Sequence, residues 1–146
     1  MADYKMFKTL TIKGTTFGLQ EGLGEHITDR KTITNFPTSW EWTSGASITF
    51  PKGNSYIVRF EANIPTATTS GSRMVGLCVS INGVQSWINR ITSADASQVV
   101  LQGMGVVNAV NYDLTATVQV VSNKAVTGNT VSTLISGVRI IEIPST

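Results

Sequence analysis

The sequence predicts an all-β fold: a two-layer antiparallel β-sandwich of the jelly-roll type. Apolar and polar residues alternate over several short segments, and turn-forming residues separate these segments. No window of a dozen residues keeps its apolar positions at the 3.6-residue period of a helix. Roughly eight short strands broken by turns are typical of a sandwich or jelly roll. The 146 residues are enough for one such domain.

The first part of the chain predicts a small hairpin followed by a linker. Residues 8–12 and 15–19 alternate as short strands around Lys13 and Gly14, whereas residues 21–35 are mixed and charged. We therefore divide the chain into an N-terminal anchoring segment with a β-hairpin, residues 1–35, and a jelly-roll head domain, residues 36–146.

Four segments of the head domain have clear limits. A short strand is predicted at residues 46–50, and a longer one at residues 55–64 ends at Pro65, because proline cannot donate to a ladder. Residues 66–72 are rich in Thr and Ser and predict a surface loop. A further short strand is expected at residues 98–101.

The best local turn signal follows residues 74–81. Val75, Leu77 and Val79 share one face of this segment, and Asn82 and Gly83 come directly after it. An Asn-Gly pair favours a two-residue hairpin, because both positions of a type I′ turn need a positive φ. The returning strand is expected to begin at Val84.

The last two strands differ in their pattern. Residues 111–122 give the cleanest alternation in the chain, as expected of a half-buried strand. Residues 131–143 instead place apolar side chains on both faces near the end, so this strand is central in its sheet or covered by another subunit. We expect it to form a trimer interface through four residues: Val138, Ile140, Ile141 and Ile143.

The order of these segments resembles the trimeric jelly-roll head shared by the C1q and tumour-necrosis-factor families and found in phage fibre tips and other virion surface proteins. The resemblance implies a homotrimer that acts by binding and assembly. The matching segments are residues 48–58, 79–83, 99–101, 112–121 and 134–143.

Composition excludes several classes of function. Charged residues make up 14% of the chain and the formal net charge is +2 with no basic stripe, so we expect no nucleic-acid binding. No run approaches the roughly 18 apolar residues of a membrane span, and no apolar run follows the first residues as in a secretory signal. The single Cys78 allows no intrachain disulfide and favours synthesis in a reducing cytoplasm.

The sequence offers no catalytic pattern. The single histidine, His26, stands among charged residues, and solvated or interface roles fit it better than catalysis. Glu61 and Asp113 fall on outward positions of separate strands. No nucleophile elbow, calcium loop or phosphate loop is present. We therefore predict a protein that is not an enzyme and has no metal or other cofactor.

Tryptophans are the strongest candidates for ligand contact, because their faces stack on sugars and anchor interfaces. Trp40 and Trp42 share a parity, for which core or subunit packing is favoured over a glycan platform. For the segment after the predicted hairpin, ligand or receptor contact and packing are equally favoured. The candidate contact residues there are Trp87, Asn89 and Arg90.

Two functional hypotheses follow. The first is a phage or phage-like virion structural protein: a homotrimeric surface head that acts in host attachment, as a tail or baseplate fibre, or in capsid decoration. It would be assembled in the bacterial cytoplasm and exposed on the virion surface, and would contact other virion proteins through the N-terminal segment and a host-surface glycan. The second is a monomeric carbohydrate-binding module. The mass in solution separates them.

Overall fold

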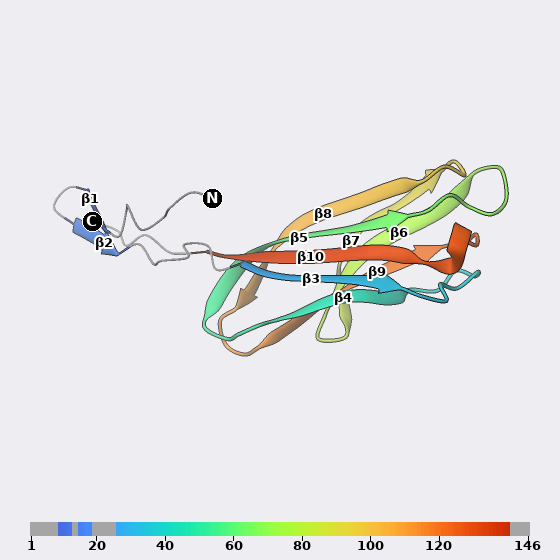
Figure 1. Cartoon of the computed structure of the whole chain (residues 1–146). Coiled ribbons are helices and arrows are strands. Elements are labelled where there is room, and N and C mark those ends of the chain that lie inside the picture. Colours follow the sequence, from blue (N-terminus) through green and yellow to red (C-terminus); the bar gives the residue numbers. More distant parts are fainter. Residues whose placement is uncertain (1–8, 13–14, 19–25, 141–146) are drawn as a thin grey trace.

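Eight antiparallel strands between residues 26 and 140 form two four-stranded sheets that pack face to face (Figure 1). A computed structural model describes residues 9–12, 15–18 and 26–140, with the side chains of 26–86 and 92–140. The eight strands are β3 His26–Ile33, β4 Thr43–Phe50, β5 Asn54–Ile64, β6 Arg73–Ile81, β7 Val84–Ala94, β8 Val99–Ala109, β9 Leu114–Ser122 and β10 Val131–Ile140. The described residues include no helix that is long and apolar enough to cross a membrane.

The pairing of the strands is that of a jelly roll. The first strand, β3, pairs with the last, β10, and moving inward along the chain β4 pairs with β9, β5 with β8, and β6 with β7. This nested hairpin is wrapped so that successive pairs fall in opposite sheets. Sheet 1 has the order β3-β10-β5-β8 and sheet 2 the order β4-β9-β6-β7. The predicted fold class is confirmed.

The core lies between the sheets and is built from the inward side of each alternating strand. The alternation predicted for residues 55–64 is confirmed, because every second side chain from Tyr56 to Ile64 is completely or almost completely buried. Val75, Leu77 and Val79 of β6 also lie in the core, but all residues from Val75 to Ser80 are buried, so β6 is covered on both faces. The central part of the core consists of Tyr56, Val58, Phe60, Val75, Leu77, Val79, Ala116, Val118, Val120 and Ile135.

The predicted hairpins form as well. Asn82 and Gly83 have φ angles of 49° and 85°, and Ile81 pairs with Val84 across the turn. At the start of the chain, β1 Thr9–Ile12 pairs antiparallel with β2 Thr15–Gly18.

One strand of sheet 1 falls in the segment expected to be a linker. β3 pairs with β10 over eight positions, and its last residue, Ile33, is buried in the core. The boundary expected at residue 35 therefore cuts a strand away from its sheet, and residues 26–35 belong to the sandwich. The anchoring role was predicted for the whole segment 1–35, and it stays a prediction.

β8 is longer than the short strand expected at residues 98–101. It continues to Ala109, and two glycines within it, Gly103 and Gly105, pair with Phe60 and Val58 of β5. Glycine at two inward positions interrupts the apolar alternation on which the prediction depended. The clean alternation at residues 111–122 begins later than expected, because residues 111–113 form the turn before β9.

A buried threonine joins the two sheets near a bulge in β4. The register of β4 against β9 shifts between Ser44 and Ser47. The Thr133 hydroxyl of β10 accepts a hydrogen bond from the Ala46 backbone N–H at 2.8 Å and donates one to the Lys31 carbonyl at 2.7 Å. These bonds tie β10 to β3 and to β4 of the opposite sheet.

The sandwich has two different ends (Figure 1). β3 begins and β10 ends at one of them, which we call the terminal end. The other, the loop end, carries the connections β3–β4, β5–β6, β7–β8 and β9–β10, including the 3-10 turn η2 Thr127–Asn129. Surfaces at both ends are candidates for function.

Candidate assembly and recognition surfaces

An apolar patch covers part of the outer face of sheet 1. Its five side chains come from the three neighbouring strands β10, β5 and β8, and between 39% and 69% of each is exposed. The apolar patch consists of Ile57, Met104, Val106, Val138 and Ile140.

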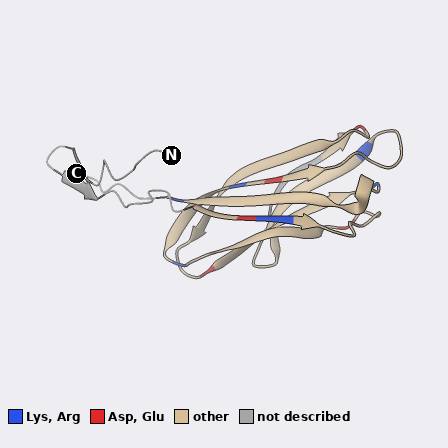
Figure 2. Ribbon diagram, viewed as in Figure 1, with Lys and Arg blue, Asp and Glu red and all other residues tan. Residues whose placement is uncertain are grey.

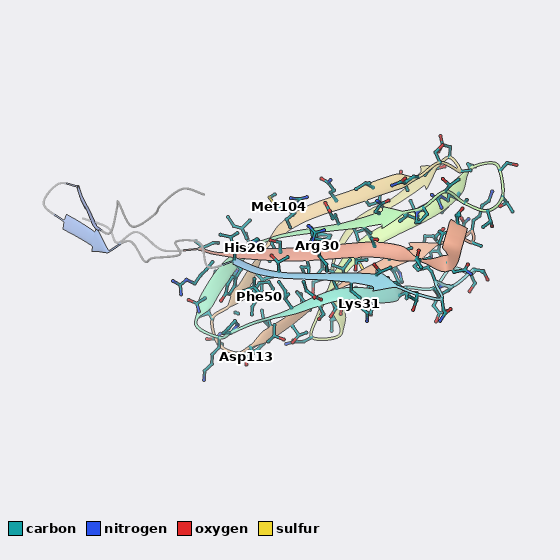
Figure 3. The ribbon with its side chains drawn as sticks, viewed as in Figure 1. His26, Arg30, Lys31, Phe50, Met104 and Asp113 are labelled. Atoms are coloured by element: carbon teal, nitrogen blue, oxygen red, sulfur yellow. The ribbon has the colours of Figure 1, made fainter. Side chains whose placement is uncertain are left out.

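The strand register makes this patch continuous. Ile57 of β5 lies directly opposite Val138 of β10 on one side and Val106 of β8 on the other. Side chains opposite one another on neighbouring antiparallel strands have their Cβ atoms about 4.5–5.5 Å apart. Met104, labelled in Figure 3, lies two residues before Val106 on the same face of β8 and is the most exposed of the five.

Charges near the patch are few and balanced. Met104 pairs with Arg59, whose guanidinium donates to the Glu61 carboxylate at 2.7 Å. Elsewhere in sheet 1 the charges concentrate on β3, as Figure 2 shows. There Asp29, Arg30 and Lys31 occupy an edge strand, where charge hinders pairing with a strand of another chain.

The outer face of sheet 2 is different, because hydroxyl and amide groups occupy it. Ser47 and Thr117 share a hydrogen bond of 2.9 Å, as do Thr49 and Thr115. The Gln85 amide donates to the Gln119 carbonyl oxygen at 3.1 Å. These groups hydrogen-bond to one another within the face and are compatible with exposure to water. The apolar patch on sheet 1 is therefore the better candidate for an interface.

Cys78 lies on this face of sheet 2 yet is fully buried. Its thiol is 3.6 Å from the Gln119 side-chain oxygen, and burial raises the pKa of the thiol to about 11. A thiol with this pKa is almost entirely protonated at neutral pH and is a poor nucleophile. A packing role therefore fits Cys78 better than a reactive one.

Backbone hydrogen bonds join the four strand-to-strand connections at the loop end to one another. The Phe36 N–H donates to the Asn129 carbonyl at 2.8 Å, which joins the β3–β4 and β9–β10 connections. The Thr127 N–H donates to the Thr66 carbonyl at 2.9 Å, and the Ala67 N–H to the Ala96 carbonyl at 2.8 Å. All four connections are thereby linked in one series.

Arg73 strengthens this series from inside. Only 1% of the residue is exposed, and its guanidinium donates to the Pro65 carbonyl at 2.8 Å and the Ser97 carbonyl at 2.9 Å. Burial lowers the pKa of Arg73, and the charge of Asp95 acts in the opposite direction. Arginine remains a cation at any physiological pH. The positively charged Arg73 side chain therefore holds the β5–β6 and β7–β8 connections together through its Nη2 atom.

Two tryptophans stand in the β3–β4 connection at this end. The Trp40 and Trp42 ring centroids are 6.3 Å apart in an edge-to-face arrangement with planes at 63°. Trp42 is half-buried, whereas Trp40 is 44% exposed. Packing thus accounts for Trp42 and leaves Trp40 as the more exposed member of the pair.

The trimer-interface residues expected from the sequence are divided by the structure. Val138 and Ile140 lie in the apolar patch, while Ile141 and Ile143 fall outside the described residues. The sequence did not identify Ile57, Met104 and Val106. The available signal was Ile57, an apolar residue on the otherwise polar parity of β5.

The expected ligand contacts lie on β7, an edge strand of sheet 2. The side chains of Trp87, Asn89 and Arg90 are outside the described part of the chain, so their contact role stays a prediction.

The three titratable residues weighed for catalysis each make a separate local contact. The His26 Nε2 atom contacts the Ser136 hydroxyl and lies 3.0 Å from the Thr28 hydroxyl. Glu61 accepts from Arg59, and Asp113 accepts from the Lys52 backbone N–H at 2.8 Å. Figure 3 shows His26 near the start of β3 and Asp113 at the turn before β9.

Comparison with known proteins shows the fold but no family. No family model matches the sequence, those of the C1q and tumour-necrosis-factor families included, and no curated protein matches it. Among solved structures, one of the infectious bursal disease virus Gx strain matches with a TM-score of 0.51 and 9% identity over 92% of this chain and 38% of that chain.

Two further solved structures are less similar. A structure of the T13 infectious bursal disease virus particle gives a TM-score of 0.45 and 10% identity over 88% of this chain and 38% of the viral one. A Podospora anserina GH26-CBM35 β-(1,4)-mannanase gives 0.33 and 10% identity over 84% and 29%. The chain therefore spans less than half the length of these proteins, and the Gx-strain likeness shows a shared jelly-roll fold.

Proposed function

We propose that this protein is a structural component of a phage or phage-like particle, a homotrimeric surface head that acts in host attachment or capsid decoration. The observation that carries the proposal is the apolar patch on sheet 1. The jelly-roll fold shared with a virus structure supports it, and the resemblance of the strand order to trimeric heads gives the number of subunits.

A second copy of the chain is the occupant that best fits the apolar patch. Contiguous exposed apolar surface on a soluble domain commonly marks an interaction site. Closed cyclic symmetry is the usual arrangement of identical subunits, and it brings the same patch of each copy toward a common axis. Because Arg59 and Glu61 form a neutral pair beside the patch, copies approach without net repulsion.

The polarity of the sandwich agrees with this role. The apolar patch includes the last described residues of β10 at the terminal end, where β3 also begins, so we place assembly and the anchoring predicted for the N-terminal segment at the same end of the sandwich. The loop end then faces away from the particle. The separate contacts of His26, Glu61 and Asp113 support a role in binding over one in catalysis.

The competing function is a monomeric carbohydrate-binding module. The exposed Trp40 favours it, because an open indole face suits a sugar ring. This alternative does not need the apolar patch, so the two functions predict different masses in solution.

A charge placed in the apolar patch tests the proposal. We expect the wild-type chain to scatter light as a trimer and Val138→Asp to scatter as a folded monomer, because three carboxylates cannot be buried together at an axis. Val84→Asp is the control, since Val84 is 68% exposed on the hairpin of sheet 2. A wild-type monomer, or a Val138→Asp trimer as stable as the control, would contradict the proposal.

A further inference from the structure

We propose that the loop end binds a neutral glycan, with the exposed Trp40 as the platform on which a sugar ring stacks. The inference deepens the proposed function, because it supplies the surface that an attachment protein needs, and it rests on different residues from those of the apolar patch.

The first step is that the surface is preformed. Hydrogen bonds join all four connections, and the buried Arg73 holds two of them from inside. The β3–β4 connection that carries Trp40 is fixed at Phe36, which is buried in the core and bonded to Asn129. A fixed surface does not lose conformational entropy when it binds a ligand, which favours affinity.

The second step concerns the chemistry of the surface around Trp40. An indole ring offers apolar area to the C–H face of a pyranose. Hydroxyl, carboxylate and backbone groups of the protein can hydrogen-bond to the hydroxyls of the sugar. Glu41, next to Trp40, is exposed, and its backbone carbonyl accepts from the Thr43 hydroxyl at 3.3 Å. Thr38 and Ser39 on the same connection are exposed, and the β9–β10 connection, which is bonded to it at Phe36, adds the exposed Asn129.

The third step is that the charges of the loop end favour a neutral ligand. The four connections contain three charged residues, Glu41, Asp95 and Lys124. The Lys124 ammonium donates to the Ser70 carbonyl at 2.8 Å, and the Asp95 carboxylate accepts from the Ser97 N–H at 2.8 Å. Glu41, next to Trp40, would repel a negatively charged glycan, so an uncharged one fits better.

The test is binding of the assembled protein to a printed array of neutral and acidic oligosaccharides. We expect the wild-type protein to bind neutral glycans, Trp40→Ala to bind them at least tenfold more weakly, and Trp40→Phe to retain part of the affinity. Tyr112→Ala is the matched control, because Tyr112 is an exposed aromatic residue in the turn at the opposite end, and it should bind like the wild type.

Failure of this inference is distinguishable from failure of the proposed function. No neutral glycan bound, acidic glycans bound alone, or undiminished binding by a folded Trp40→Ala variant would each overturn it. Should Trp40→Ala fail to melt cooperatively, Trp40→Phe decides. A folded Trp40→Phe variant with reduced affinity for neutral glycans supports the inference, whereas full wild-type affinity contradicts it. The oligomeric mass does not depend on any of these results.

Discussion

Thr133 shows how a single hydroxyl can compensate for an irregular strand. The bulge in β4 leaves Gly45 and Ala46 without paired positions in β9, and side chains of sheet 1 accept from the Ala46 and Ser47 N–H groups. The Thr133 hydroxyl accepts from the Ala46 N–H, and the Asp29 carboxylate accepts from the Ser47 N–H at 2.9 Å. Gly45 permits this approach, because a Cβ atom at that position would lie 2.3 Å from the Thr133 hydroxyl oxygen.

Replacing Thr133 with valine tests this arrangement. The shape of the side chain is nearly preserved, but the buried Ala46 N–H loses its acceptor and the Lys31 carbonyl loses a donor. We expect the free energy of unfolding to fall by about 1–3 kcal/mol, measured by urea denaturation. Thr115→Val is the control, since its hydroxyl pairs with that of Thr49 on an outer face, and it should cost about 0.5 kcal/mol or less. Equal losses for the two variants would contradict the role given to Thr133.

Among the elements, β3 shows most clearly where reasoning from sequence ends. The strands on which alternation was clear, β5, β6 and β9, could be predicted because each presents a full apolar face to the core. β3 has only Ile27 and Ile33 at its apolar positions, because Asp29 faces β4 and supplies a hydrogen bond in place of apolar contact. A strand stabilised by polar contacts with a distant segment leaves no periodic signal.

The candidate surfaces were predictable to a different degree. Val138 and Ile140 could be identified as candidate interface residues from the sequence, because the last strand alone shows apolar side chains on both of its faces. The rest of the apolar patch required the register that aligns Ile57 with Val138 and Val106. The hydrogen-bonded series at the loop end was not predictable either, since it joins backbone groups from connections with no shared motif.

Two truncations test the place of β3. Removal of residues 1–25 should leave a domain that melts cooperatively, because all eight strands remain. Removal of residues 1–35 deletes β3, exposes one edge of β10 and takes Ile33 from the core. We expect the longer truncation to unfold at a clearly lower temperature or without cooperativity in a calorimetric scan. Identical melting of both truncations would show that β3 is dispensable.

At the scale of the whole molecule, the surface proposed for assembly and the surface proposed for recognition are separated along the length of the sandwich. The apolar patch lies toward the terminal end, where β10 ends, and the connections that carry Trp40 lie at the loop end. Neither surface shares a residue with the other. Substitutions in one are therefore expected to leave the other function intact, as independent sites usually do.

The most direct test of assembly through sheet 1 uses two methionines on opposite outer faces. Met104 lies in the apolar patch on sheet 1, and Met74 is partly exposed on the outer face of sheet 2. Dilute peroxide oxidises an accessible thioether to the sulfoxide, and mass spectrometry of peptides gives the rate at each position. The account predicts that Met104 is oxidised much more slowly in the wild-type assembly than in monomeric Val138→Asp, while Met74 is oxidised at the same rate in both. Equal Met104 rates in the two proteins would contradict assembly through this face.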